Sequence, residues 1–363
     1  MSIYIKSEYL MNKLKDTLSM CEHCYRHVPA VRFEKDNQIW LGKTCPEHGY
    51  HECLVEIDAE FYNSQVYEKR RPSSYWLDIT NRCNLDCPHC YQIPDNLSED
   101  PTVDWILNQV MSWDDDGAAL ALVGAEPTTR KDLADIIEKI NNLPRKQRLI
   151  MIVTNGINLG KRAYAGKFTK FDNVVWTIGL NHPDYNGGVI RQRQEAGIKN
   201  CQELGLKIKN MTYTLGDLDQ LDFVLDEMQH WYNSGAADEV RIQVGVEIGR
   251  TPDGDHREYY LSDLVNHAKK LCLEKNYTWE EDTSIANRTH YAVKVNGVTH
   301  RFIKWCDVKT IDLEETQSES WANLIPHKPM SPLLHQVILR DRFINNRKPL
   351  FDTVPEKYTK DGQ

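Results

Sequence analysis

The chain has 363 residues, of which 40% are hydrophobic and 27% are charged, a composition typical of soluble globular proteins. Its formal net charge of −9 argues against a general nucleic-acid or anionic-membrane surface. No apolar run is as long as a transmembrane helix, and the N-terminus lacks the apolar core of a signal peptide. Ten cysteines without a secretion signal therefore predict metal binding in a reducing cytoplasm rather than disulfides.

The N-terminal region covers residues 1–66. Its first 20 residues are mixed and charged, which we interpret as a short amphipathic helix. Two short apolar runs, residues 30–33 and 39–41, flank a Lys-Asp-Asn turn and predict a β-hairpin. Pairs of soft metal ligands lie at the two ends of this hairpin: Cys21, Cys24, Cys45 and His48.

Thiolates and an imidazole held by tight turns are suited to a tetrahedral metal site. A unit of this size is too small for a core of its own, so the metal would supply part of its folding free energy. We expect zinc, with a mononuclear iron site as the alternative, because these ligands do not discriminate strongly between the two metals. Cys53, on the strand that follows, is the alternative to His48 as fourth ligand.

The second region, residues 67–250, begins with a short apolar strand and a loop of cysteines. An aromatic residue ends this loop, in the spacing C-x3-C-x2-C-aromatic: Cys83, Cys87, Cys90 and Tyr91. Thiolates hold iron–sulfur clusters, and a cubane normally takes four of them. Three thiolates without a fourth nearby leave one iron open to a substrate or cofactor, which is the arrangement of an enzyme. The alternatives are a zinc loop or three unrelated core cysteines.

Strands and helices alternate along this second region. The expected strands are residues 75–80, 119–123, 149–154, 174–180, 207–214 and 240–246. The expected helices are residues 103–113, 131–141, 189–204 and 218–231, with a short one near 159–165. Such alternation predicts an α/β protein with a parallel sheet. Six βα units favour a partial (β/α)6 barrel, because a closed eight-unit barrel needs two more.

Candidate site residues follow the second, third and fourth expected strands and lie at the start of the helix after the fourth. They are Gly124, Ala125, Glu126, Asn155, Asn181, Arg191 and Arg193. Ligands of parallel α/β sheets bind at the carboxyl ends of the strands, so this position makes them candidates for a binding site. Plain turns and solvated helix charges are the alternatives for the asparagines and arginines.

The third region, residues 251–363, is an irregular α+β extension. It contains an expected helix at 261–272, a hairpin at 291–303 that turns at an Asn-Gly pair, and a helix at 333–343. Cys201 precedes this region and is interpreted as a core residue. Cys272 and Cys306 are widely spaced and receive no role, so we expect a single iron–sulfur cluster.

The cysteine loop resembles the signature of the radical S-adenosylmethionine (radical SAM) superfamily. Residues 124–127 resemble its Gly-Gly-Glu-Pro motif, with Ala125 in place of the second glycine. The resemblance implies the six-unit barrel and a [4Fe–4S] cluster on Cys83, Cys87 and Cys90, whose open iron chelates SAM. A low-potential electron donor, a flavodoxin or a ferredoxin, is implied with it.

The resemblance also implies roles for the strand-end residues. Glu126 would bind the SAM amino group, Asn155 the methionine or ribose, and Tyr91 would lie against the adenine. Arg191 or Arg193 would pair with the SAM carboxylate, since a guanidinium fits a carboxylate well. Relatives commonly carry Ser-Leu-Asp-Gly where this chain has Gly-Leu-Asn-His at residues 179–182, so the role of Asn181 stays open.

The Cys/His segment looks like the N-terminal part of one branch of this superfamily. That branch includes the archaeal tetraether lipid synthase and the dihydropterin methyltransferases, and the likeness runs from about residue 18 to residue 250. The expected function is therefore reductive cleavage of SAM to a 5′-deoxyadenosyl radical that abstracts hydrogen from an unidentified substrate. A radical-based methyl or carbon–carbon bond-forming transferase is one alternative, and a non-catalytic metal-ribbon binding module is another. The oligomeric state stays open.

Overall fold

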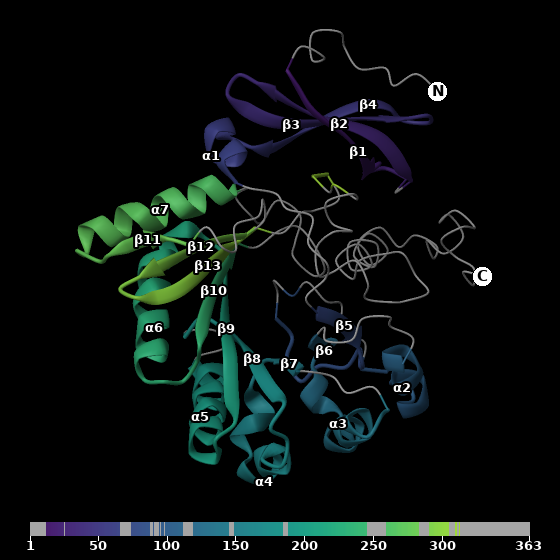
Figure 1. Ribbon diagram of the computed structural model, residues 1–363, viewed down its shortest axis with the longest axis vertical. Helices are drawn as coiled ribbons and strands as arrows, with labels where there is room; N and C mark the ends of the chain where they lie inside the picture. The colour runs from purple at the N-terminus through teal and green to yellow at the C-terminus, as the bar shows by residue number, and fades with distance from the viewer. Residues whose placement is uncertain are drawn as a thin grey trace.

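The computed structural model describes residues 12–24, 26–65, 74–87, 90, 94, 96–97, 99–111, 119–144, 149–183, 188–244, 259–282, 290–304, 309–310 and 312. None of the helices in these ranges combines the length and the apolar character that a membrane crossing requires. The described strands form one sheet of four strands and one of nine. The small N-terminal sheet lies beyond one end of the large sheet (Figure 1).

The small sheet is antiparallel and follows chain order. Its strands are β1 (Lys13–Met20), β2 (His27–Lys35), β3 (Gln38–Cys45) and β4 (Gly49–Glu56), and helix α1 (Ala59–Ser64) follows. The predicted hairpin is confirmed and is longer than expected. Asp36 and Asn37 form its turn with φ values of 53° and 59°, and these residue types tolerate the left-handed region better than others.

The helix expected within the first 20 residues is wrong for residues 13–20, which form β1. Thr17 and Ser19 are buried on one face of this strand, and the intervening Leu18 is exposed. This alternation has the period of a β-strand. It follows from the antiparallel pairing with β2, which decides the conformation of residues 13–20 more than their own mixed sequence does. Residues 1–11 lie outside the described residues.

The large sheet contains the six predicted parallel strands in sequential order. They are β5 (Ser74–Asp78), β6 (Ala119–Val123), β7 (Ile150–Thr154), β8 (Val174–Leu180), β9 (Lys207–Leu215) and β10 (Glu239–Val244). The main helices between them are α2 (Val103–Met111), α3 (Leu133–Asn141), α4 (Arg162–Ala165), α5 (Val189–Leu204) and α6 (Leu221–Asn233). Short 3-10 turns are η2 (Pro127–Thr129), η3 (Ile157–Gly160), η4 (Gly166–Phe168) and η6 (Leu218–Gln220). The series of βα units is the one predicted for a partial barrel.

The sheet does not end at residue 250, where a domain boundary was expected. After α7 (Leu261–Glu274), β13 (Val298–Ile303) pairs in parallel with β10. Strands β12 (His290–Val295) and β11 (Trp279–Glu281) extend it antiparallel. The boundaries at 66 and 250 remain predictions, and Cys306 and the expected helix at 333–343 lie outside the described residues.

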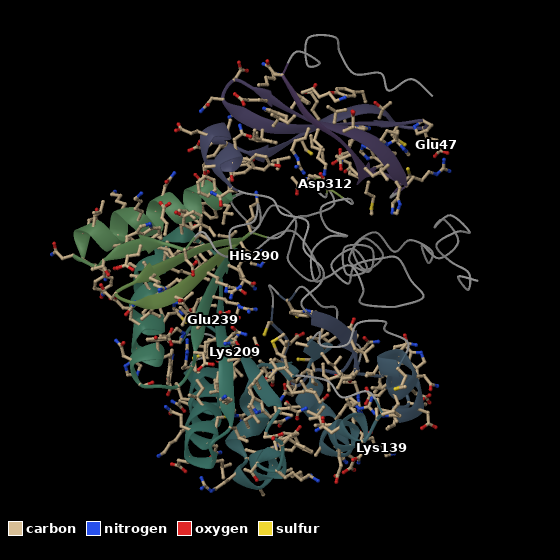
Figure 2. The ribbon with its side chains drawn as sticks, viewed as in Figure 1. Glu47, Lys139, Lys209, Glu239, His290 and Asp312 are labelled. Atoms are coloured by element: carbon tan, nitrogen blue, oxygen red, sulfur yellow. The ribbon has the colours of Figure 1, made fainter. Side chains whose placement is uncertain are left out.

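A charged contact accompanies the unexpected pairing of β10 with β13. Arg241 and Arg301 are direct neighbours across the two strands, a placement of like charges that is unfavourable by itself. Glu239 resolves it, because its carboxylate accepts hydrogen bonds of 2.8 Å from the Nη2 atoms of both arginines. Burial and then these two arginines lower the pKa of nearby His290 to about 3. Figure 2 labels Glu239 and His290 beside this part of the sheet.

The two faces of the parallel strands have different packing. The helix-facing side of the inner strands is fully buried in the main core: Leu120, Leu122, Ile150, Ile152, Trp176 and Ile178. The opposite side carries a smaller cluster: Ala121, Val123, Met151 and Val175. Helix packing on one face therefore fixes the strands and leaves their carboxyl ends free for a site.

The small sheet is fixed to the rest of the molecule by buried polar contacts. Arg32 forms an ion pair with Asp312, and both side chains are at most 4% exposed. Figure 2 labels Asp312 beneath the small sheet. The buried Lys43 donates to the carbonyl oxygen of Lys309 at 2.8 Å. Glu56, at the end of β4, accepts a hydrogen bond of 2.5 Å from the Ser262 hydroxyl in the first turn of α7.

We expect Arg32→Met to lower the free energy of unfolding by about 3–5 kcal/mol, because it leaves Asp312 as a buried charge without its partner. Arg26→Met is the matched control, since Arg26 pairs with Glu47 and both side chains are half exposed. That pair should contribute less than about 1 kcal/mol. Urea unfolding of the full chain, followed by circular dichroism, measures both changes. Equal losses in the two variants would contradict the assignment.

Candidate active site

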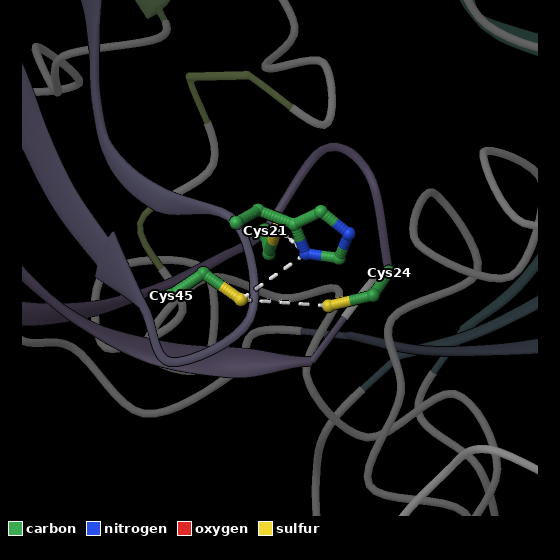
Figure 3. Close-up of side chains that lie close together, drawn as sticks. Cys21, Cys24 and Cys45 are labelled. Atoms are coloured by element: carbon green, nitrogen blue, oxygen red, sulfur yellow. Dashed lines mark hydrogen bonds between the residues drawn. The ribbon is translucent and has the colours of Figure 1, made fainter.

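The four predicted ligands of the small sheet converge on one point (Figure 3). The Sγ atoms of Cys24 and Cys45 are 3.7 Å apart, and His48 Nδ1 lies 3.4 Å from Cys45 Sγ and 3.7 Å from Cys21 Sγ. A tetrahedron with metal–sulfur bonds of about 2.3 Å has sulfur–sulfur edges of roughly 3.8 Å. The donor set therefore fits a tetrahedral metal ion without rearrangement.

Two thiols of this set have opposite pKa shifts. Burial raises the pKa of Cys24 to about 11. Burial acts in the same direction on Cys45, but hydrogen bonds from His48 and from nearby backbone amides overcome it and lower its pKa to about 6. Cys45 therefore exists mainly as a thiolate at neutral pH, which is the form that binds a metal.

Cys53 lies outside this set. Its Sγ atom donates to the carbonyl oxygen of Lys309 at 2.8 Å and lies 3.6 Å from the carbonyl oxygen of Leu41. The geometry therefore places His48, and not Cys53, together with the three cysteines.

The cysteine loop follows β5 and is shaped by contacts of its own. The backbone N–H of Cys83 donates to Asn96 Oδ1 at 2.9 Å, and the Leu85 N–H points at Cys83 Sγ at 3.3 Å. The Cys90 N–H donates to the carbonyl oxygen of Cys87 at 3.3 Å. Burial is the main reason that the pKa of the Cys83 thiol rises to about 11. A desolvated thiol of this kind is deprotonated only when a metal is bound.

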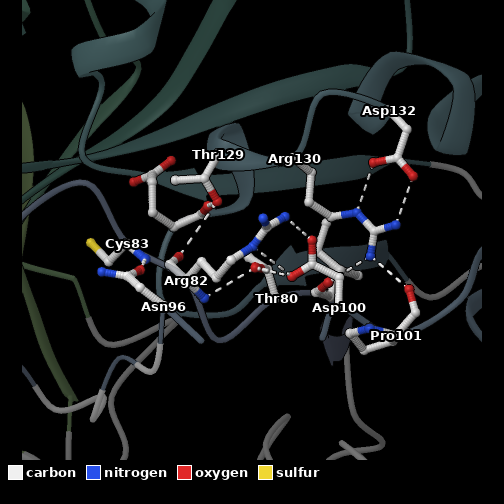
Figure 4. A network of polar contacts seen from close by, with 11 residues as sticks. Thr80, Arg82, Cys83, Asn96, Asp100, Pro101, Thr129, Arg130 and Asp132 are labelled. Carbon is white, nitrogen blue, oxygen red and sulfur yellow. Dashed lines mark hydrogen bonds and ion pairs between the residues drawn. The ribbon is translucent and has the colours of Figure 1, made fainter. Parts of the chain in front are cut away.

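Arg82 attaches the first turn of the cysteine loop to Asp100 (Figure 4). Its guanidinium forms a two-pronged ion pair with Asp100, with Nε 3.2 Å from Oδ1. The Thr80 hydroxyl donates to the same carboxylate at 2.6 Å. Two-pronged pairs restrict orientation as well as distance, so this contact fixes the residue directly before Cys83.

A second arginine fixes the strand from which the loop emerges (Figure 4). Arg130 is buried, and its Nη1 donates to the carbonyl oxygens of Ile79 and Pro101 at 2.8 Å each. Its other nitrogens pair with Asp132 at 2.9 and 2.7 Å. Neither Arg82 nor Arg130 was predicted, because the carboxylate that holds Arg82 and the carbonyl oxygens that Arg130 contacts are 18 or more residues away in sequence.

Gly124 supplies the close approach of the β6 loop to the β5 loop. Its φ is +131°, and a Cβ atom there would lie 2.2 Å from the carbonyl oxygen of Thr80. The next amide, that of Ala125, donates to the same oxygen at 3.0 Å. A positive φ is unfavourable for a residue with a side chain. The structure places it at Gly124, so alanine is tolerated at 125.

The carboxylate of Glu126 lies in the loop after β6 and contacts the end of β7. It is 1% exposed and accepts hydrogen bonds from the Asn155 N–H at 2.7 Å and the Thr154 hydroxyl at 2.6 Å. It also accepts from the amide and hydroxyl of Thr128. Burial raises its pKa, and these donated bonds oppose the rise. This side chain therefore joins β6 to β7, and its contact with the SAM amino group stays a prediction.

Side chains from the ends of β7 and β8 reach the cysteine loop. Asn155 Nδ2 donates to Asn84 Oδ1 at 2.7 Å, and Asn181 Nδ2 lies 3.5 Å from Cys87 Sγ. Gln194 of α5 is fully buried and donates to the carbonyl oxygen of Asn155 at 2.9 Å and to Asn181 Oδ1 at 3.1 Å. The structure thus brings the two predicted asparagines to the predicted cysteines.

Gln194 was not among the predicted residues, although the sequence carried a signal for it. Gln194 lies four positions after Ile190 and four positions before Ile198, so it interrupts a stripe of apolar residues on one face of the helix. A polar side chain in such a stripe is buried and needs partners.

The two predicted arginines have different surroundings. Arg191 is buried and pairs with Glu227 of α6 at 2.6 Å, and its Nη2 donates to the carbonyl oxygen of Asn181 at 2.5 Å. Arg193 is exposed on the helix surface. Within the described residues, Arg191 therefore supports the β8 loop, and its pairing with the SAM carboxylate stays a prediction. Tyr91 lies outside the described residues.

Comparison with known proteins identifies two domains. Residues 77–225 match the model of the radical SAM superfamily, and residues 13–57 match the HMPTM N-terminal zinc ribbon domain. The chain therefore contains a radical SAM domain preceded by a zinc ribbon. This confirms the predicted superfamily and the α/β fold class with an N-terminal ribbon.

The chain is similar to enzymes with different reactions. A 7,8-dihydro-6-hydroxymethylpterin dimethyltransferase of Methanocaldococcus jannaschii is 28% identical over 53% of this chain and 45% of that protein. A GTP 3′,8-cyclase of Limosilactobacillus fermentum is 27% identical over 62% of this chain and 69% of that protein. The structure of Streptococcus suis SuiB bound to precursor peptide SuiA aligns with a TM-score of 0.46 and 20% identity, covering 68% of this chain and 51% of that one. The chain thus spans about half the length of the first of these relatives.

Because His48 and not Cys53 lies with the three ribbon cysteines, we expect His48→Ala to lose the tightly bound metal and Cys53→Ala to keep it. The loss of one of four ligands should weaken binding enough for a mild chelator to remove the ion. Metal analysis by mass spectrometry after dialysis against the chelator compares the two variants. The reverse pattern would make Cys53 the ligand.

Proposed function

We propose that this protein is a radical SAM enzyme with one [4Fe–4S] cluster on Cys83, Cys87 and Cys90. The observation that carries the proposal is the convergence of Asn155 and Asn181, from two neighbouring strand ends, on the cysteine loop. Three thiolates at this position hold three irons and leave the fourth for SAM. An amide N–H directed at a cysteine sulfur also suits a cluster ligand, whose charge it stabilises.

When bound, the cluster and SAM supply the reductive cleavage of SAM to methionine and a 5′-deoxyadenosyl radical, which abstracts hydrogen from the substrate. The residues of the chain supply position. Arg82 holds the start of the cysteine loop, and Gly124 lets the β6 loop approach it. Glu126 ties that loop to Asn155, so the groups that would border SAM form one connected frame.

Two further assignments belong to this proposal. A low-potential flavodoxin or ferredoxin donates the electron, since radical SAM enzymes require a reductant. The ribbon ion is zinc with a structural role, because four protein ligands fill its coordination sphere.

A second candidate is a radical-based methyl or carbon–carbon bond-forming transferase. The match of residues 13–57 to the HMPTM ribbon and the similarity to a pterin dimethyltransferase favour it. SAM labelled separately in its methyl group and in its 5′ carbon tests methyl transfer, because a methyltransferase places the methyl label in the product. Recovery of all the methyl label in methionine would exclude methyl transfer. Tight binding of a partner without any SAM cleavage would instead favour a non-catalytic binding module.

We expect Cys87→Ala to abolish both the cluster and the formation of 5′-deoxyadenosine. Cys201→Ala is the matched control, because Cys201 is buried in α5 within the core. Iron content and 5′-deoxyadenosine after anaerobic reconstitution with SAM and a reductant measure the effect. SAM cleavage that survives in Cys87→Ala would refute the assignment.

Asn181→Ala should lower the reduction potential of the cluster, because it removes an N–H group that stabilises the extra negative charge of the reduced state. Asn155→Ala is the control, since its side chain contacts Asn84 and not a cysteine sulfur. A redox titration followed by EPR gives both potentials. An unchanged potential in Asn181→Ala would remove this residue from the surroundings of the cluster.

A further inference from the structure

A second group of metal-ligating side chains lies beside the ribbon site. Glu22 and His23 occupy the two positions between Cys21 and Cys24, and His51 follows on β4. Glu22 Oε1 lies 3.7 Å from His51 Nδ1 and 4.0 Å from His23 Nε2. One donor atom of each residue lies within 4.8 Å of the other two. The same turn thus presents its cysteines to one centre and its two intervening side chains to another.

We propose that Glu22, His23 and His51 form a second cation site, for a divalent transition metal such as zinc. Two imidazoles and one carboxylate are a common donor set for such ions. Ligand atoms about 2.1 Å from a metal are roughly 3.0–3.4 Å from one another. Two of the observed separations are 3.7 and 4.0 Å and the third is at most 4.8 Å, so side-chain rotations would be needed to close the site.

Electrostatics favours a cation at this position. Three thiolates and one divalent ion give the neighbouring centre one net negative charge, and the Glu22 carboxylate adds another. The ring centroid of His23 lies 5.2 Å from that of His48, a ligand of this centre. A second cation would therefore sit in a negative potential, which offsets the repulsion between two nearby metal ions.

The site is open to solvent on one side. The side chains of Glu22 and His51 are 25% and 22% exposed, and that of His23 is 50% exposed. Three ligands leave at least one coordination position for water or another ligand, unlike the closed ribbon site. His51 Nε2 is buried without a hydrogen-bond partner in the described structure. The other ring nitrogen, Nδ1, already faces the Glu22 carboxylate, so Nδ1 is the atom that would bind the ion.

Zinc binding to the reconstituted full chain tests the proposal. In a buffer of fixed free zinc, wild-type protein should hold about two zinc ions per chain. Glu22→Gln and His51→Ala should hold about one. Glu47→Gln and His230→Ala are matched controls, because both residues are exposed and lie outside the group. One zinc ion in the wild type, or two in both site variants, would overturn the proposal.

Cobalt distinguishes loss of the second site from loss of the ribbon. The ribbon centre bound to Co²⁺ has sulfur-to-metal charge-transfer absorption, whereas a site of two histidines and a carboxylate has none. Glu22→Gln changes one atom of the side chain, so the ribbon should fold and keep this absorption while one cobalt ion is lost. Loss of the charge-transfer band together with the second ion in Glu22→Gln would show a structural role only, and would reject the proposal.

Discussion

The buried carboxylate of Glu126 is the contact on which the candidate active site depends. Glu126 lies in the loop after β6. Its carboxylate accepts hydrogen bonds from two groups at the end of β7, the Asn155 N–H and the Thr154 hydroxyl. A carboxylate that is 1% exposed has lost its hydration and needs these donors to compensate. Because the donors belong to β7, the two strand ends cannot move independently. Asn155 is thereby fixed where its side chain meets the cysteine loop.

The rest of the site repeats this arrangement with other buried polar groups. Gln194 joins the ends of β7 and β8 by donating to the backbone of Asn155 and to the side chain of Asn181. Arg130 holds the end of β5 through the carbonyl oxygen of Ile79. Each group is buried and each is satisfied by partners from a different loop. Networks of this kind are rigid because any displacement leaves a desolvated group without its hydrogen bond. The rigidity of the site therefore comes from buried side chains that join one loop to another.

Local patterns explain which parts of this structure could be predicted. The parallel strands and their helices have periodicities that need no distant partner, and the cysteine spacing carries its own chemistry. Strand β13 could not be placed, because its pairing with β10 joins residues more than 50 positions apart. Strand β1 was misread because its partner β2, rather than its own pattern, decides its conformation. The surroundings of Arg191 could not be predicted for a similar reason: its partner Glu227 lies on another helix, and sequence alone does not reveal this pairing.

The zinc ribbon is connected to the large sheet through the chain that follows β13. Lys43 and Cys53 both donate to the carbonyl oxygen of Lys309, and Arg32 pairs with Asp312. Lys309 and Asp312 come only a few positions after β13, the strand that extends the parallel sheet beyond β10. A metal ion bound to the four proposed ribbon ligands would stabilise the folded ribbon, which makes these contacts. Metal binding at the ribbon is therefore expected to stabilise the far edge of the sheet as well as the ribbon itself.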